Sequence, residues 1–250
     1  MYQTHPSFTA PRSEDIKIWR YLDIAKFAYM ISKKNLYFPK ASKLEDAFEG
    51  SYTKKSVDTR SEFFKSVARG NPNLNIERQI SEFAKQIREH VYISSWHMNS
   101  HESAAMWNLY SQGGKGIAIQ STFKGLKNSF KNLKEDIFIG KVKYIDYDKD
   151  LIDTKNLLNP FIRKRKSFEY EYELRVILAR LSEASFRPKS ENDNSPDGIY
   201  LEVDLDKLIE SVYISPTSKD WEIDLVNILM ENFQLRKPLI MSSLSASPLY

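Results

Sequence analysis

The spacing of apolar and polar residues along the chain predicts short strands that alternate irregularly with helices. Apolar runs of strand length end at Pro, Gly or polar turns, and stretches with helical periodicity separate them. The predicted strands span residues 16–21, 36–38, 90–95, 116–120, 138–145, 174–178, 199–203 and 212–215. The predicted helices span residues 23–32, 61–69, 76–89, 102–110 and 219–233.

This order of elements indicates the fold class. Strands outnumber long helices, and their alternation is too irregular for a doubly wound parallel sheet. We therefore expect an α+β fold with a mixed, mainly antiparallel sheet, continuous or split, surrounded by helices. A chain of 250 residues is compatible with a single domain. Residues 1–14 are expected to be a short flexible segment, and the polar stretch 187–198 a loop.

The segment 168–175, which reads FEYEYELR, has an acid at every second position. In an extended strand, Glu169, Glu171 and Glu173 would all project from one face. Like charges on one face repel each other, so water, a cation or a substrate must lie against them, which makes the segment a candidate site. The alternative is a solvated strand edge, or acids balanced by the basic run 163–166 just upstream.

A second candidate is Arg20, which lies among aromatic residues in the first predicted strand. An arginine in such a place needs an anion or a carboxylate for its guanidinium group. The partner is either a ligand or an internal acid, for which Asp46, Glu49, Glu171 and Glu173 are the candidates.

The third candidate is the stretch 94–103, which reads SSWHMNSHES and leads from a predicted strand into a helix. Small polar side chains at such a junction can form the wall of a ligand site. The alternative places Trp96 in the core and uses Ser94 and Ser95 to fill the strand. His97 and His101 are four residues apart, but His97 is expected to precede the helix, so no metal site is predicted.

Composition limits the chemistry further. The chain has no Cys, which excludes disulfides, thiolate catalysis and cysteine-bound zinc. Its formal net charge of +4 does not by itself indicate a nucleic-acid-binding protein. The sequence shows neither the pattern of a signal peptide nor an apolar run of membrane-spanning length, so we expect a cytoplasmic protein without a membrane partner.

Several of these segments together carry a family resemblance. The order WRY, LYF, EDAFEG, SSWHMNSHESAAMWNLY, KGIAIQ, FEYEYELR and VYISP resembles the bacterial family of unknown function DUF2971 over residues 16–243. The order of elements also resembles, more distantly, that of ADP-ribosyltransferases. Those enzymes carry an Arg on a first strand, a Ser on a central strand and a Glu near a late strand.

The resemblance to ADP-ribosyltransferases implies that NAD is the substrate. Its ADP-ribose would pass to a macromolecular acceptor, either protein or nucleic acid, or to water. The implied setting is a bacterial toxin or an anti-phage defence system, and the implied partner is a protein from the same system. The residues in the implied cofactor-binding role are Arg20 for the pyrophosphate and Tyr21, Tyr37 or Trp96 for the nicotinamide ring.

The same resemblance implies the catalytic roles. Glu173 would stabilise the oxocarbenium-like ribose, and Glu171 would orient the acceptor or act as a base. Ser94 or Ser95 would hold the carboxylate by a hydrogen bond. This arrangement requires Arg20 and the acidic residues to meet across one cleft.

Two alternatives give these residues another role or none. The basic run 163–166, with Lys141, Lys143 and the cationic segment 123–134, could bind nucleic acid. A nuclease could hold a divalent metal with Glu169, Glu171 and Glu173, joined by Asp46 or Glu49. A non-enzymatic partner-binding module of a defence system would need neither set.

Overall fold

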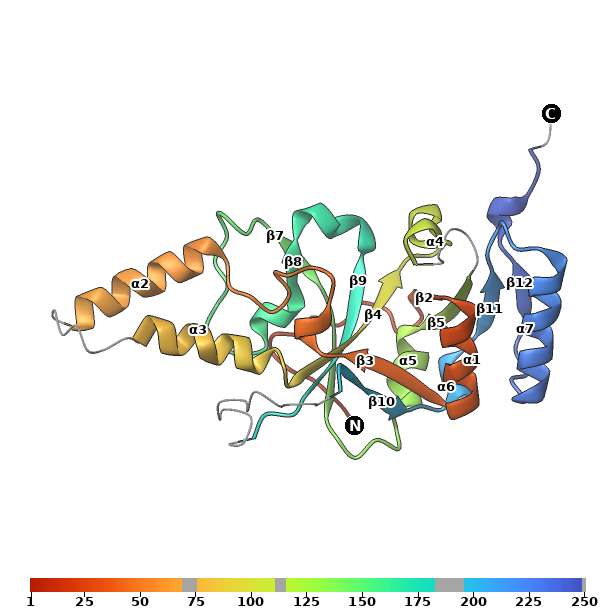
Figure 1. Cartoon of the computed structure of the whole chain (residues 1–250), viewed down its shortest axis with the longest axis horizontal. Coiled ribbons are helices and arrows are strands. Elements are labelled where there is room, and N and C mark those ends of the chain that lie inside the picture. Colours follow the sequence, from red (N-terminus) through yellow and green to blue (C-terminus); the bar gives the residue numbers. More distant parts are fainter. Residues whose placement is uncertain (69–75, 111–115, 183–195, 249–250) are drawn as a thin grey trace.

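The computed structural model describes residues 1–68, 76–110, 116–182 and 196–248 (Figure 1). The strands are β1 (Tyr2–Gln3), β2 (Lys17–Leu22), β3 (Asn35–Pro39), β4 (Val91–Met98), β5 (Ile117–Thr122), β6 (Ile137–Lys141), β7 (Lys143–Ile145), β8 (Arg163–Arg165), β9 (Glu173–Ala179), β10 (Gly198–Glu202), β11 (Ser211–Ile214) and β12 (Leu239–Met241). The helices are α1 (Ile24–Lys33), α2 (Lys54–Ala68), α3 (Ile76–Ile87), α4 (Ala104–Tyr110), α5 (Phe123–Ser129), α6 (Leu205–Leu208) and α7 (Asp220–Asn232). Short 3₁₀ helices are η1 (Ala41–Lys43), η2 (Asn159–Ile162), η3 (Lys166–Glu171) and η5 (Ser243–Ser245).

The main sheet has eight strands in the order β1-β6-β9-β4-β2-β5-β11-β12. Its two outermost pairs, β1 with β6 and β11 with β12, are parallel, and the pairs between them are antiparallel. Two small sheets, β10 with β3 and β7 with β8, lie beside it. The predicted α+β fold with a mixed, mainly antiparallel sheet is confirmed.

Strand register determines which side chains share a face of the main sheet. Directly opposed residues of an antiparallel pair project to the same side. His97 of β4 lies opposite both Trp19 of β2 and Glu173 of β9, so these three side chains share one face, here called the Glu173 face. Arg20 follows Trp19 in the same strand and therefore projects to the other face, here called the Arg20 face.

Each face is covered by its own apolar layer. On the Arg20 face, α1 packs on the sheet through Phe27, Met30 and Ile31, which lie on one side of the helix. The Asp23 side chain begins this helix by accepting a hydrogen bond from the backbone N–H of Lys26. The Glu173 face is covered partly by α4 and partly by η2 with the chain around it.

Outside the sheet, α2 and α3 form a pair that projects from one end of the molecule (Figure 1). The N-terminal segment, expected to be flexible, packs against the sheet: residues 2–3 form β1, and Phe8 is 9% exposed. Of the loop expected at 187–198, residues 187–195 lie outside the described ranges, and Gly198 already begins β10. Among the described residues, no helix combines the length and apolar character needed to cross a membrane.

Candidate functional site

Five charged side chains meet beneath the Glu173 face and form the group that we call the Lys164 cluster. Its members come from four places in the chain: the turn before α2, β8, the end of η3 and β9. All are buried, with relative exposures of 1–7%. They are Glu49, Lys164, Glu171, Glu173 and Arg175.

Arg175 uses its whole guanidinium group inside the cluster. It donates to both carboxylate oxygens of Glu49 at 2.6 and 2.7 Å. It also donates to both oxygens of Glu173 at 2.8 and 3.2 Å, and to the carbonyl oxygen of Phe161 at 2.8 Å. These bonds match the five N–H donors of an arginine, so its charge is fully compensated despite burial.

Gly50 allows Glu49 to reach Arg175. Its φ of 70° lies in the left-handed region, and a side-chain carbon at this position would lie 2.3 Å from the Phe161 ring. Glycine is therefore required both for the turn and for the close packing beside the cluster.

Lys164 holds two carboxylates at once. Its ammonium nitrogen lies 2.7 Å from Glu171 and 2.5 Å from Glu173, and 3.5 Å from Glu49. Three carboxylates thus face only two cations, Lys164 and Arg175. If every group were ionised, the cluster would hold one uncompensated negative charge in a buried place, which is unfavourable.

The pKa values of the two neighbouring glutamates are pushed apart by this arrangement. Burial, followed by the hydrogen bond and the charge of Glu173, raises the pKa of Glu171 to about 7, although Lys164 opposes the shift. Burial also acts on Glu173, but the charges of Arg175 and Lys164 outweigh it and hold its pKa well below the usual range. Glu171 is therefore the member of the pair that exchanges a proton near neutral pH.

The local backbone differs from the expected strand. Residues 166–171 form the 3₁₀ helix η3, and Tyr172 has a φ of 41°, so β9 begins only at Glu173. Glu169 is exposed, whereas Glu171 and Glu173 are buried. The predicted row of three acids on one strand face is therefore wrong. The ion pairs to Lys164 fix two of the acids, and the third faces solvent.

His97 fixes the position of Glu171 from the neighbouring strand. Its Nδ1 lies 2.6 Å from the carbonyl oxygen of Glu171, and because a carbonyl can only accept, Nδ1 carries the hydrogen. Nε2 is then a bare acceptor; it is buried and has no partner among the described residues. His97 lies within β4 and therefore precedes helix α4, as expected, and His101 follows the strand.

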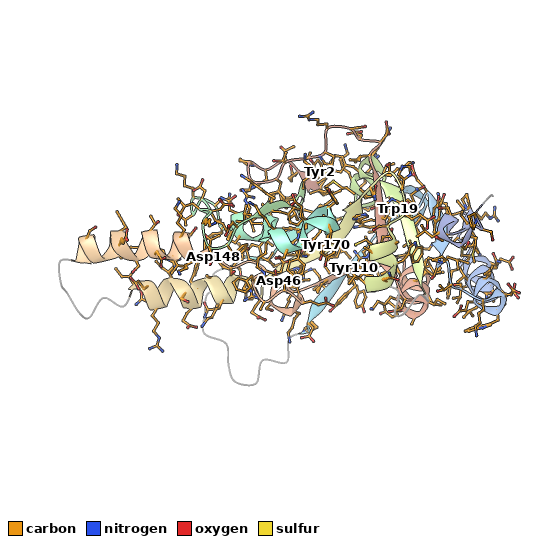
Figure 2. All side chains as sticks on the ribbon, turned by 90° about the horizontal axis from the view of Figure 1, so that it is seen from above. Tyr2, Trp19, Asp46, Tyr110, Asp148 and Tyr170 are labelled. Atoms are coloured by element: carbon orange, nitrogen blue, oxygen red, sulfur yellow. The ribbon has the colours of Figure 1, made fainter. Side chains whose placement is uncertain are left out.

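Tyr110 at the end of α4 borders the same group. Its side chain is 38% exposed, and partial burial together with the charge of Glu171 raises the pKa of its hydroxyl. Figure 2 shows Tyr110, Asp46 and Tyr170 in the same central part of the molecule, although they come from distant segments. Ser95 is exposed in the middle of β4 on this face, so solvent reaches the sheet there.

The structure divides the predicted site residues between the two faces. The Glu173 face carries Glu171, Glu173, Ser95 and Tyr21. The Arg20 face carries Arg20, Ser94, Trp96 and Tyr37. The expectation that Arg20 and the acids meet across one cleft is therefore wrong, because alternate residues of a strand point in opposite directions.

Arg20 instead has local partners on its own face. It donates to the Ser94 hydroxyl and, at 3.1 Å, to the carbonyl oxygen of Tyr37, and it lies 5.8 Å from the Trp96 ring centroid. Among the described residues, no carboxylate forms an ion pair with it. The expected internal acid is therefore not its partner.

Two of the predicted ring partners for nicotinamide are buried. Tyr21 is 6% exposed, and its hydroxyl accepts a hydrogen bond from the backbone N–H of Ser103 at the start of α4. Trp96 is 1% exposed, and its Nε1 has no partner among the described residues. Neither ring offers an exposed surface in this structure.

The basic run 163–166 is largely used within the protein. Lys164 is buried in the cluster, and Arg165 forms two hydrogen bonds with Asp46 at 2.7 and 3.2 Å. Arg163 is partly buried, which leaves Lys166 as the exposed member. Within the described ranges, no group of three or more His, Asp or Glu is arranged to hold a metal ion.

Sequence reasoning missed Arg175 as part of the site, and it included Lys164 only within the basic run expected to balance the acids. The ion pairs of Lys164 with Glu171 and Glu173 confirm that alternative. Both cations were visible, Lys164 in the basic run and Arg175 at the end of FEYEYELR, but a charge run usually indicates a solvated surface. The available signal was the apolar sequence around Arg175, since an arginine in a buried strand needs carboxylates.

Comparison with known families bears on the same region. Residues 106–176 match the model of the family described as protein of unknown function (DUF2971). This DUF2971 segment includes Lys164, Glu171, Glu173 and Arg175, whereas Arg20 lies outside it. The predicted resemblance to DUF2971 is thus supported over residues 106–176. Searches of curated proteins and of solved structures found no match.

Proposed function

We propose that the Lys164 cluster is the catalytic centre of an enzyme in which Glu171 transfers a proton and Glu173 remains ionised, and that its substrate is NAD. ADP-ribose would pass to a macromolecule or to water. The observation that carries the proposal is the sharing of one ammonium group by two carboxylates from residues 171 and 173. The choice of NAD rests on the resemblance to ADP-ribosyltransferases in the order of elements alone, since Arg20, the residue expected to hold the pyrophosphate, lies on the other face.

The geometry supports different roles for the two acids. Glu173 is bonded to both Arg175 and Lys164, so its charge is already compensated and it acts to position its neighbours. Glu171 has one cation partner, Lys164, and its backbone is fixed by His97. Ser95, exposed on the same face, marks where a substrate can reach the sheet.

The proposed reaction breaks one bond at ribose C1′, forms another and transfers one proton. The bond between ribose C1′ and the nicotinamide nitrogen breaks, and its electron pair neutralises the pyridinium ring. The oxygen of water or of the acceptor forms the new bond to C1′, and its proton passes to the ionised Glu171. Because Glu171 must be ionised to accept it, the rate should rise with pH through about 7.

The test is release of nicotinamide from NAD, which accompanies both hydrolysis and transfer. The purified protein is incubated with NAD, with and without a cell extract that supplies acceptors, and nicotinamide is measured by chromatography. Glu171→Gln should reduce the rate by about 100-fold or more, as expected for loss of a general base.

Glu169→Gln is the matched control, because this acid lies two residues away and is exposed. It should leave the rate unchanged. Absence of nicotinamide release from the wild-type protein in both conditions would contradict NAD as the substrate. Release that persists in Glu171→Gln would contradict the role of Glu171.

The nuclease alternative receives less support. Of the acids that it requires, Glu171 accepts from Lys164 with one oxygen and Glu173 accepts from Lys164 and Arg175 with both, whereas Glu169 is exposed and away from them. The cations proposed to bind nucleic acid are partly the same buried or paired residues. The role of a partner-binding module stays an alternative that the Glu171→Gln variant tests.

A further inference from the structure

We propose that a pocket on the Arg20 face is a second binding site, for a small ligand that joins a flat aromatic ring to an anionic group. This site is separate from the Lys164 cluster, which lies on the opposite face of the sheet. It does not depend on the function proposed for that cluster.

The pocket lies between α1, β3 and β10 and has a volume of about 370 Å³. Leu22, Ala25, Met30 and Leu36 provide its apolar lining. Polar or aromatic side chains complete it: Arg20, Lys26, Tyr29, Asn35, Tyr37 and Tyr200. An apolar pocket with a few converging polar groups is the usual form of a small-molecule site.

Arg20 supplies the anion-binding group. Its two hydrogen bonds to Ser94 and Tyr37 go to uncharged oxygens, so they leave its positive charge without a carboxylate among the described residues. Burial disfavours this charge and lowers the pKa of Arg20 to about 10. A ligand carboxylate or phosphate would supply the missing negative charge, and a guanidinium group can bind either one bidentately.

Three tyrosines supply the surface for a ring. The Tyr200 ring centroid lies 5.1 Å from that of Tyr29 and 5.0 Å from that of Tyr37, so the three form a continuous aromatic group. Tyr200 is 52% exposed and Tyr29 is 44% exposed. Flat rings stack well on such surfaces.

Asn35 adds a specific polar contact. Its side-chain oxygen is buried and has no hydrogen-bond partner among the described residues, although it belongs to the pocket lining. A buried acceptor without a partner is unfavourable unless a ligand or water donates to it. A ring that carries an N–H group would satisfy it.

The size of the pocket favours a small ligand. Its volume of about 370 Å³ is near the lower end of the roughly 300–1,000 Å³ found for small-molecule pockets. This favours a mononucleotide or an aromatic carboxylate over a dinucleotide such as NAD. The two sources share the same chemistry, and the experiment separates them.

The test uses isothermal titration calorimetry of the whole chain with adenosine monophosphate and, separately, with indole-3-acetate. At least one should bind with a dissociation constant below 1 mM, an affinity of about −4 kcal/mol. Adenosine, which lacks the anion, should bind at least 10-fold more weakly than adenosine monophosphate if the nucleotide is the ligand. A neutral ring such as benzyl alcohol should likewise bind more weakly than indole-3-acetate if the carboxylate is the ligand.

Two variants locate the binding. Tyr200→Ser removes an exposed ring and should weaken binding about 5-fold or more without unfolding the protein. Arg20→Lys keeps the charge but loses the planar fork and should weaken it about 10-fold or more. Tyr170→Ser is the matched control, since Tyr170 is 45% exposed and lies in η3, away from this pocket.

Three results would overturn the proposal: neither anion binds at 1 mM, the neutral ring binds as tightly as its anion, or Tyr200→Ser binds as well as the wild type. The function proposed for the Lys164 cluster can fail independently. Glu171→Gln should leave this binding unchanged, whatever its effect on nicotinamide release.

Discussion

Replacing Arg175 with Met tests whether the Lys164 cluster holds the fold together. The change removes five hydrogen bonds and leaves Glu49 buried with only Lys164 at 3.5 Å as a cation partner. Breaking a buried ion pair from one side destabilises a protein by about 3–5 kcal/mol. At about 2–4 °C per kcal/mol for a chain of this size, the melting temperature should fall by about 6–20 °C.

Urea unfolding followed by tryptophan fluorescence measures this loss, since Trp19, Trp96 and Trp107 are all buried. Arg180→Met is the matched control: Arg180 binds Glu135 through two similar hydrogen bonds at 2.7 and 2.9 Å, but both side chains are solvent-exposed. An exposed pair contributes only about 0.2–1 kcal/mol.

A double variant separates the loss of the Arg175–Glu49 ion pair from the cost of leaving the Glu49 carboxylate buried without this partner. Arg175→Met combined with Glu49→Met replaces both buried charges with apolar groups, and it should recover at least half of the stability lost in the single variant. If Arg175→Met destabilised the protein no more than Arg180→Met, the argument that burial makes the cluster strong would be refuted.

Two further predictions concern the same region. Because the pKa of Glu171 is raised from 4.5 to about 7 in the folded state, the folded protein binds more protons in that window and the contribution of Glu171 to stability falls as pH rises through it. Glu171→Gln cannot titrate, so between pH 4.5 and 8 it should gain stability relative to the wild type by up to about 3 kcal/mol; urea unfolding at both pH values checks this, and an unchanged difference would contradict the shift. Gly50→Ala should destabilise the protein by about 1–3 kcal/mol because of its φ of 70° and the contact with Phe161, and a melting temperature equal to that of the wild type would show that the turn can relax.

Hydrophobic periodicity predicted most of the elements that form the sheet. The first strand, expected at 16–21, is β2 (Lys17–Leu22), and the helix expected at 23–32 is α1 (Ile24–Lys33). The final helix, expected at 219–233, is α7 (Asp220–Asn232). These segments have clear apolar patterns and local start signals such as Asp23, which is why sequence alone identified them.

Other elements lacked such signals. Helix α5 (Phe123–Ser129) contains Gly125 and begins through the Thr122 side chain, so its helical pattern is short and weak. Strand β4 continues to Met98, because Trp96 and His97 pair with β9, although SSWHMNS resembles a turn. At η3, an alternating pattern predicted a strand, but tertiary ion pairs and the left-handed Tyr172 decided the backbone.

The site was harder to predict than the fold because it depends on which way neighbouring residues point. Arg20 and Trp19 are adjacent, yet one faces an aromatic pocket and the other lies on the side of Glu173. Strand order alone could not determine this, since a shift of one residue in register exchanges the two faces. The pairing of His97 with both Trp19 and Glu173 fixes it.

Folding and the proposed chemistry depend on the same buried charges, so the choice of variant decides what an activity loss means. Arg175 and Glu173 bind each other and hold separate segments together, and a variant of either can lose activity because the protein unfolds. Glu171 has fewer bonds and carries the exchangeable proton, and glutamine keeps its shape. A Glu171→Gln protein that remains folded but inactive would therefore show that proton transfer at this residue, rather than the integrity of the cluster, limits the reaction.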